Sequence, residues 1–314
     1  MRFVDEHRDE HGVEPIINAL AGTCAQIARS TYYAARTRPP SARAVADVAT
    51  LARIRAVHDA NYGVYGARKT WRCLARADHH VARCTVERVM RANGIRGITN
   101  AKSPRTTIPG PTGDRPGDLV GRAFTAAGPN QLWVADITYI RTFSGWVYAA
   151  FVMDMYSRRI VGWQVSTSLH TTLALDALEM GLWNRDRQAN NADDRADLVH
   201  HSDRGVQYRA VRYTERLADA EVVASVGSKG DSYDNAAAEA FDNIFKSELI
   251  RNRHVLAKRG HWRGIDDVEI AVAEWVEWYN TTRLHGSLGD VPPTEYESHY
   301  YANQAVPQPV GATP

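Results

Sequence analysis

The segment from residue 131 to 166 constrains the fold more than any other part of the chain, because it predicts three consecutive β-strands. The stretches QLWVADITYIR (131–141), WVYAAFVMD (146–154) and IVGWQVS (160–166) are rich in β-branched and aromatic residues. The connections between them, TFSG and MYSRR, are short and contain turn-forming residues. Consecutive strands with such connections pair as antiparallel neighbours. The sequence therefore predicts a three-stranded antiparallel meander.

Helices and strands alternate after this meander. The pattern predicts, in order, a helix at about 171–184, the strand LVHH (198–201), a helix near 210–218, the strand VVASV (222–226) and a helix at about 235–249. Three hairpin strands followed by alternating helices and strands is the element order of a ribonuclease H-like fold. We therefore expect an α/β domain over 119–300, in which helices flank a mixed sheet and a helical extension follows it.

Residues 1–99 have a different, all-helical pattern. One helix is expected near 67–76, a turn around Asp78, and a second helix that ends at Asn93 and Gly94. Apolar residues of the second helix share one face, and its basic residues lie outside that face. This arrangement resembles a helix-turn-helix over about 60–97. The predicted DNA contacts of this region are Arg68, Lys69, Arg83, Arg88 and Arg91.

The charge distribution supports a DNA-binding N-terminal region. Residues 1–120 carry 19 Lys and Arg against 11 Asp and Glu, whereas acids outnumber bases in the remainder, 25 to 19. Binding to a phosphate backbone requires such a basic excess, because it releases condensed counterions. The alternative interpretation is a solvated basic face, since 33 of the 38 basic residues are Arg and arginine is frequent throughout the chain.

Composition bounds the remaining segments. Prolines and glycines gather in residues 100–118, which predicts an interdomain linker, and residues 301–314 are typical of a disordered tail. The longest apolar run, 146–153, is too short to span a bilayer. Three cysteines are too few for a disulfide framework, which favours a reducing cytoplasm without a membrane partner.

Three acids follow the predicted strands and helix in a way that indicates a shared site. Asp136 interrupts the first strand, where a carboxylate is costly unless it is paired or binds a metal. Asp203 follows the strand LVHH after one intervening residue, Ser202, and 35 residues separate it from Glu239. On a helix, Glu239, Asn243 and Lys246 share one face.

Hard oxygen donors on two strands and a helix suit two Mg²⁺ ions about 4 Å apart, and Mn²⁺ could substitute for them. Such a pair of ions activates a water or 3′-hydroxyl nucleophile and stabilises the leaving oxygen of a phosphodiester. His201, on the same strand face as Asp203, and Asn243 are candidate assisting residues. Asp154 opens a turn and is interpreted as a turn former. Cys73, His79, His80 and Cys84 lack the paired spacing of a zinc site.

Several ordered motifs then resemble one family. They are PNQLWVADITYI (129–140), DMYSRRIVGW (154–163), HHSDRGVQY (200–208), GDSYDNAAAEAF with FKSEL (230–249) and WYNTTRLHGSLGDVPPTEY (278–296). The chain resembles the integrase-type transposases of insertion sequence family three, the longer of that family's two reading-frame products (OrfB), related to retroviral integrases. The resemblance implies an Asp-Asp-Glu metal site, carried by Asp136, Asp203 and Glu239, with Lys246 as a DNA contact. Asp242 departs from the family pattern, which has an uncharged residue there.

The implied activity is Mg²⁺-dependent cleavage at the ends of an insertion element and transfer of the 3′-hydroxyl to target DNA. The implied partners are double-stranded DNA, further copies of the chain in a homo-oligomer, and an upstream-frame protein, in the nucleoid of a bacterial cytoplasm. Two alternatives stay open here. One is a ribonuclease H-like nuclease that cuts RNA–DNA hybrids, and the other is a catalytically silent regulator that occupies the element ends.

Overall fold

The computed structural model describes residues 1–99, 126–188, 197–203, 207–208, 210–226 and 236–305. The chain divides into two compact units, Met1–Arg53 and Ile54–Pro314. In the first unit, α1 (Arg2–His11), α2 (Val13–Ala19) and α3 (Arg29–Thr37) surround a small core of Val4, Ile16, Ile17 and Tyr32. The predicted linker at 100–118 lies outside the described residues.

The second unit begins within a long helix, α4 (Ala42–Ala60), which α5 (Ala67–Arg76) and α6 (Arg83–Ala92) follow. The bounds of α5 are the predicted ones, and the turn at Asp78 has a positive φ of 56°. The apolar face predicted for the second helix is buried, through Val86, Val89 and Met90. The helix-turn-helix pair expected from the sequence is therefore present.

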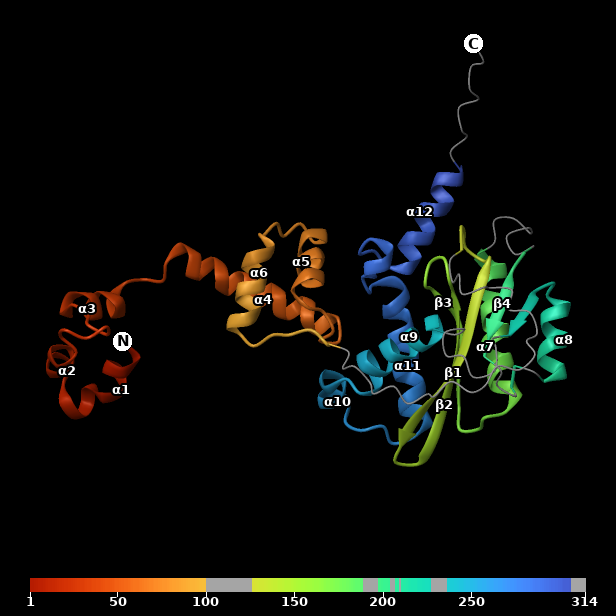
Figure 1. Ribbon diagram of the computed structural model, residues 1–314, viewed down its shortest axis with the longest axis horizontal. Helices are drawn as coiled ribbons and strands as arrows, with labels where there is room; N and C mark the ends of the chain where they lie inside the picture. The colour runs from red at the N-terminus through yellow and green to blue at the C-terminus, as the bar shows by residue number, and fades with distance from the viewer. Residues whose placement is uncertain (100–125, 189–196, 204–206, 209, 227–235, 306–314) are drawn as a thin grey trace, which may run out of the picture. The chain divides into compact units, whose positions relative to one another are not determined.

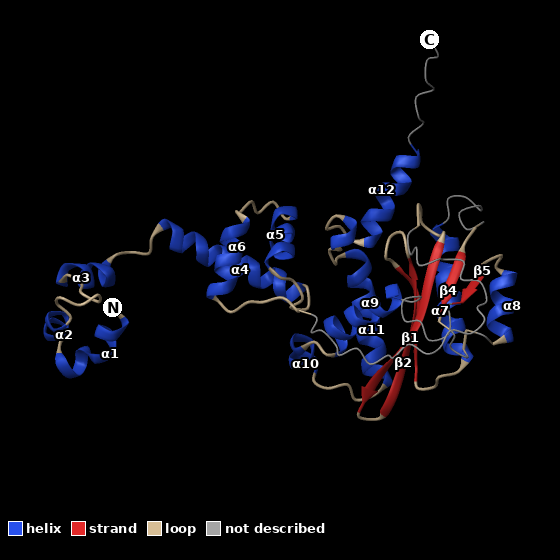
Figure 2. Cartoon of the chain, viewed as in Figure 1, coloured by secondary structure: helices blue, strands red, loops and turns tan. Residues whose placement is uncertain are grey.

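A five-stranded mixed sheet forms the centre of the second unit (Figures 1 and 2). Its strands are β1 (Leu132–Thr142), β2 (Gly145–Asp154), β3 (Ile160–Ser166), β4 (Val199–Ser202) and β5 (Val223–Val226). The order is β3-β2-β1-β4-β5, with β1 to β3 antiparallel and β4 and β5 parallel to β1. The predicted meander and the ribonuclease H-like mixed sheet are thus confirmed.

Helices cover both faces of this sheet and bury a different core on each side. On one face α7 (Thr171–Gln188) and α8 (Val211–Asp219) pack over Trp133 and Ala135 of β1. On the other, α9 (Ala236–Phe245) and α11 (Ile265–Thr281) pack over Val134 and Ile140. Because side chains alternate along a strand, Asp136 belongs to the face with Val134, under α9.

The helix predicted at 235–249 has a break that the sequence pattern does not indicate. α9 ends at Phe245, and Lys246–Ile250 form a π-helical turn, after which come α10 (Arg253–Arg259), a short 3₁₀ turn (Gly286–Leu288) and α12 (Pro293–Ala305). π-turns within helices are frequent at functional sites. The prediction of a disordered tail from 301 was wrong for 301–305, which belong to α12, and its remaining residues, 306–314, lie outside the described residues.

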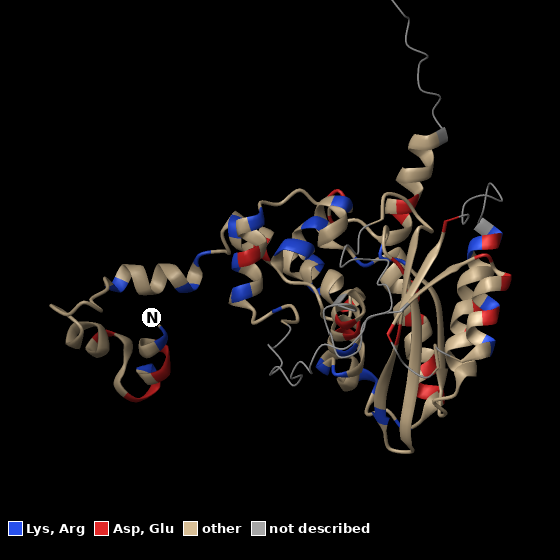
Figure 3. Cartoon of the chain, turned by 45° about the vertical axis from the view of Figure 1, so that its right-hand side comes forward, with Lys and Arg blue, Asp and Glu red and all other residues tan. Residues whose placement is uncertain are grey.

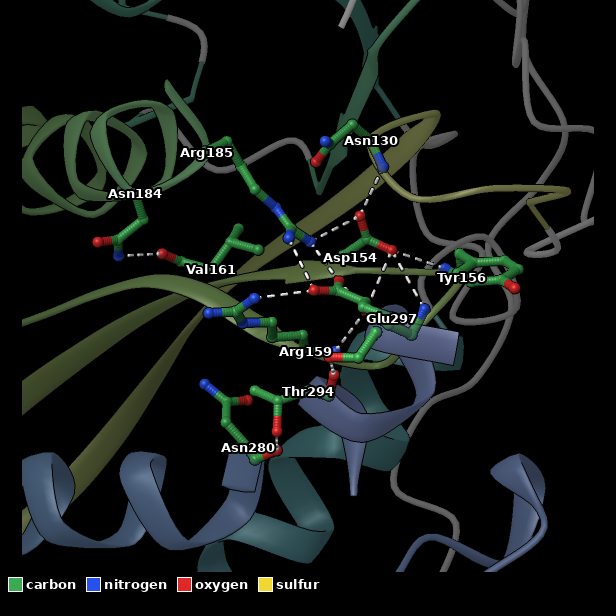
Figure 4. A network of polar contacts seen from close by, with 12 residues as sticks. Asn130, Asp154, Tyr156, Arg159, Val161, Asn184, Arg185, Asn280, Thr294 and Glu297 are labelled. Atoms are coloured by element: carbon green, nitrogen blue, oxygen red, sulfur yellow. Dashed lines mark hydrogen bonds and ion pairs between the residues drawn. The ribbon is translucent and has the colours of Figure 1, made fainter. Parts of the chain in front are cut away.

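A buried ion network fastens α12 to the sheet (Figure 4). Asp154, at the end of β2, accepts hydrogen bonds from the backbone of Asn130, Tyr156 and Ser157, as its predicted turn role requires. It is also paired with Arg185 of α7, at 3.2 Å. Arg185 and Arg159 both pair with Glu297 of α12, at 2.5 and 2.8 Å. Burial alone would raise the pKa of Glu297, but its two arginine partners hold the pKa below its ordinary value.

The helix-turn-helix pair is attached to the α/β domain by buried polar contacts. Tyr65 accepts a hydrogen bond from the backbone of Leu284 at 2.8 Å, and Trp278 donates to Asn61 at 3.0 Å. Both sets of residues belong to the compact unit that begins at Ile54. The helix pair is therefore packed onto the α/β domain within one unit, although residues 100–125 separate the two in sequence.

Candidate active site

The pairing of β1 with β4 brings the first two predicted acids together. In this parallel register Val134 lies opposite His201 and Ala135 opposite Ser202. Asp203 is the next residue after the paired segment, so it lies beside Asp136. Asp203 is exposed at the carboxyl edge of β4, the edge at which open α/β sheets place their sites.

The helix α9, which packs on the sheet face that bears Asp136, carries two further acids. Glu239 lies in its first turn and is exposed, and Asp242 follows one turn later. The helix is held against β2 by Phe241 and Phe245, whose rings contact Phe151 at centroid distances of 5.1 and 4.9 Å. Asp242 is the residue that interrupts the family pattern, and the structure makes it a neighbour of Asp136.

The pKa of Asp136 is affected by these neighbouring acids. Burial, followed by the charges of Asp242 and Asp203, raises its pKa to about 7 against an opposing effect of Lys246. Burial and Asp242 likewise raise the pKa of Glu239. Carboxylates that share a site resist ionisation, and a bound cation would offset that repulsion.

The side chains suit a hard divalent cation by their chemistry. All the acids offer oxygen donors, which Mg²⁺ prefers. Within the part of the chain that the structure describes, the oxygens of Asp136, Asp203 and Glu239 are not gathered within 4.8 Å of one another. The segments 204–206 and 227–235, which adjoin Asp203 and the start of α9, lie outside the described residues.

Lys246 is held by the unexpected acid. Its Nζ lies 2.8 Å from Oδ2 of Asp242, one helical turn earlier, with both side chains about one-fifth exposed. The other oxygen of Asp242, Oδ1, is buried and has no hydrogen-bond partner among the described residues. The sequence predicted Lys246 as a DNA contact, and the structure places it at the rim of the acid cluster. The sequence signal that could have assigned Asp242 to the site is its charge, because the family pattern has an uncharged residue at this position.

The two candidate assisting residues differ in position. His201 is buried within the sheet, with its Nδ1 3.0 Å from Oγ of Ser225 on β5. Asn243 is exposed on α9. Neither position tests a catalytic role, but His201 is enclosed by the sheet whereas Asn243 faces outward.

Basic residues recur along the helix pair that carries the predicted DNA contacts (Figure 3). Arg83 is exposed and paired with Glu87 at 2.8 Å, Arg88 is half-buried, and Arg91 is exposed. Arg68 pairs instead with the buried Asp290, at 2.7 Å. Burial and the nearby Arg283 lower the pKa of Lys69 to about 8. These last two residues therefore lie toward the catalytic core.

A groove of about 670 Å³ opens beside Lys246. Basic and aromatic side chains line it, among them Tyr139, Arg141, Trp146, Arg251, Arg253 and His261. Tyr139 and Trp146 are about half exposed, and the guanidinium of Arg141 lies over the Trp146 ring at 5.2 Å. Exposed aromatic rings with arginines are the side chains on which nucleic-acid bases and phosphates can bind.

Comparison with known proteins agrees with this geometry. Residues 126–232 and 221–293 match models of the integrase core domain, and residues 46–103 match an HTH-like domain. A Mycobacterium tuberculosis (strain CDC 1551 / Oshkosh) protein named for the transposase of insertion sequence element IS986/IS6110 is 49% identical over 90% of this chain and 98% of its own. The chain belongs to the integrase-type transposases of insertion sequence family three.

Other family members and solved structures are also similar to it. The transposase for insertion sequence element IS629 of Shigella sonnei is 44% identical over 96% of this chain and 97% of its own. The HTLV-2 integrase catalytic core domain, solved in complex with magnesium, has a TM-score of 0.41 at 12% identity, covering 55% of this chain and 98% of that one. No helix in the described part of this family member is long and apolar enough to cross a membrane.

Proposed function

We propose that the chain binds the ends of an insertion element, hydrolyses the phosphodiester at each 3′ end and joins the freed 3′-hydroxyl to target DNA. The observation that carries this proposal is the β1–β4 register, which sets Asp203 beside Asp136 under the helix that bears Glu239. Family membership supports the same activity.

Asp136, Asp203 and Glu239 would hold two Mg²⁺ ions, which Mn²⁺ could replace. When bound, such ions activate the nucleophile and offset charge on the leaving oxygen. The protein's own side chains bind and orient the DNA. Lys246 offers hydrogen-bond donors and no lone pair, so it contacts a phosphate without competing for metal. Asp242 holds the Lys246 ammonium at the rim until the phosphate arrives.

The partners follow from the reaction. Element ends and target are double-stranded DNA, which the arginine-rich surface of α6 and the groove beside Lys246 would contact. Because transposition brings two ends together, we propose that the chain acts as a homo-oligomer in the bacterial nucleoid. An upstream-frame protein is a further proposed partner.

A strand-transfer assay tests the proposed function. A labelled duplex of the element end is incubated with the protein, Mg²⁺ and a plasmid target. We expect cleavage at the 3′ end and covalent joining of the label to the plasmid. Cleavage of an RNA–DNA hybrid without joining would support the nuclease instead, and end binding without cleavage would support the silent regulator.

The arginines of α6 give a prediction about binding. Changing Arg83, Arg88 and Arg91 together to Ala should weaken end binding and reduce the salt dependence by about one unit of slope per lost phosphate contact. The measurement is the association constant against salt concentration. A matched control is Arg263→Ala, because Arg263 pairs with Asp267 in the same i, i+4 geometry elsewhere. An unchanged slope in the triple variant would identify the arginines as merely solvated.

Lys246 gives a prediction about cleavage. Lys246→Ala should slow end cleavage roughly tenfold or more, about 1.4 kcal/mol of transition-state stabilisation. The alternative is that Lys246 only neutralises Asp242. The double variant Asp242→Asn with Lys246→Ala separates the two explanations, because it also removes the carboxylate that Lys246→Ala alone leaves without its cation. If Lys246 contacts DNA, the double variant stays slow; recovery of the rate shown by Asp242→Asn alone would contradict the DNA contact.

A further inference from the structure

A second group of metal-type ligands lies apart from the acids, where α4 meets α10. One ring nitrogen each of His58 and His254 and one carboxylate oxygen of Asp59 lie within 4.8 Å of one another. His58 and Asp59 are in the last turn of α4, and His254 is in the first turn of α10. The two imidazole rings pack edge to face, with centroids 5.9 Å apart.

The hydrogen bonding of His58 leaves a nitrogen lone pair for a ligand. Nε2 of His58 lies 3.2 Å from the carbonyl oxygen of Arg96. Because a carbonyl only accepts, this contact assigns the proton to Nε2 and the lone pair to Nδ1. A metal-bound histidine commonly donates its other N–H to a backbone carbonyl in this way.

One ring nitrogen of His254 is buried without a hydrogen bond. Its Nε2 is buried and makes no hydrogen bond to the described residues, although Oδ1 of Asp59 lies 3.4 Å away. A buried polar atom without a hydrogen bond is uncommon in native proteins and points to a missing ligand or solvent partner. The nearby carboxylate makes a cation the fitting ligand.

The backbone holds the two sides of the group at close approach. Gly63 has a φ of 68°, and a Cβ there would lie 3.1 Å from the His254 side chain and 3.2 Å from Cε1 of His58. Asn252 donates to the carbonyl of Tyr62 at 2.8 Å and caps α10 by accepting from the His254 backbone at 2.9 Å. Contacts of Gly63 and Asn252 therefore help to hold His58, Asp59 and His254 together.

We propose that His58, Asp59 and His254 bind one Zn²⁺ ion that links α4, the helix before the helix-turn-helix pair, to α10 of the catalytic core. Two imidazoles and a carboxylate are ligands that zinc takes, and water would complete four-coordination. Lys258, whose Nζ lies 4.0 Å from Asp59, is exposed and can move into solvent. The site does not depend on the proposed DNA chemistry. A metal that binds only the folded state also stabilises the junction.

The experiment uses the full chain with Asp136→Asn, Asp203→Asn and Glu239→Gln, so that the active-site acids do not contribute. The protein is freed of metal with a chelator, titrated with Zn²⁺ by calorimetry, and melted with and without Zn²⁺. Co²⁺ serves as a spectroscopic probe, because tetrahedral Co²⁺ absorbs strongly in the visible range. We expect one equivalent of Zn²⁺, a higher melting temperature and a tetrahedral Co²⁺ spectrum.

His58→Gln and His254→Gln, each in the same background, should weaken Zn²⁺ binding by at least the roughly tenfold that even an outer-shell change costs. His261→Gln is the control, since His261 is an exposed histidine of the same unit. Metal-free melting temperatures close to that of the parent would show that the variants fold. Absence of stoichiometric Zn²⁺ binding in the parent, or equal binding in His254→Gln, would overturn the proposal.

Discussion

Replacing any one of the three acids should abolish end cleavage while leaving folding and end binding intact. The variants are Asp136→Asn, Asp203→Asn and Glu239→Gln, each nearly isosteric with the native side chain. Removing one carboxylate disrupts a two-metal site, which acts as a unit. The helix pair and its arginines are unchanged. Single-turnover cleavage of labelled end duplex measures the effect, and end binding is measured in parallel by gel shift.

A matched acid separates this site from acidity in general. Asp219→Asn changes a carboxylate at the end of α8, and it should cleave at the parental rate. Cleavage at the parental rate in any of the three site variants would contradict the assignment of that residue.

Glu297→Ala should strongly destabilise the catalytic unit. Glu297 is buried, and its removal leaves the buried guanidinium of Arg185 with the Asp154 carboxylate, at 3.2 Å, to offset its charge. Breaking a buried pair from one side costs about 3–5 kcal/mol. At roughly 2–4 °C per kcal/mol for a unit of this size, the melting temperature should fall by about ten degrees. Calorimetry and denaturant unfolding measure both quantities.

The control for Glu297 is an ion pair of the same kind at the surface. Glu179 pairs with Arg216, and their side chains are 45% and 33% exposed. Glu179→Ala should therefore cost no more than about 1 kcal/mol. Equal stability losses in the two variants would show that burial is not what makes the Glu297 network important.

The elements of the core could be predicted from the sequence because each has a clear local pattern. Strands β1 to β3 are rich in β-branched and aromatic residues between short turns, and α5 has the predicted bounds. The carboxyl end of LVHH also marked Asp203, since a polar run directly follows apolar strand residues. These features depend on neighbours in the chain, so sequence reasoning could reach them.

The features that the sequence could not predict depend on distant residues. Asp154 has the local pattern of a turn former, and only the fold brings Arg185 and Glu297 to it. The π-turn at Lys246 breaks a helical pattern that continues to 249 in sequence. Likewise His254 is far in sequence from His58 and Asp59, so no ligand spacing marks the three. The packing of the helix pair onto the core rests on contacts such as that of Tyr65 with Leu284.

The central claim is that the same acids serve strand transfer as well as cleavage. The most direct measurement uses an end duplex already cut to expose its 3′-hydroxyl, incubated with Mg²⁺ and a plasmid target. The account predicts that the parental protein joins this end to the plasmid and that Asp203→Asn does not, although it binds the duplex equally well. Joining by Asp203→Asn at the parental rate, or hydrolysis without any joining by the parental protein, would contradict it.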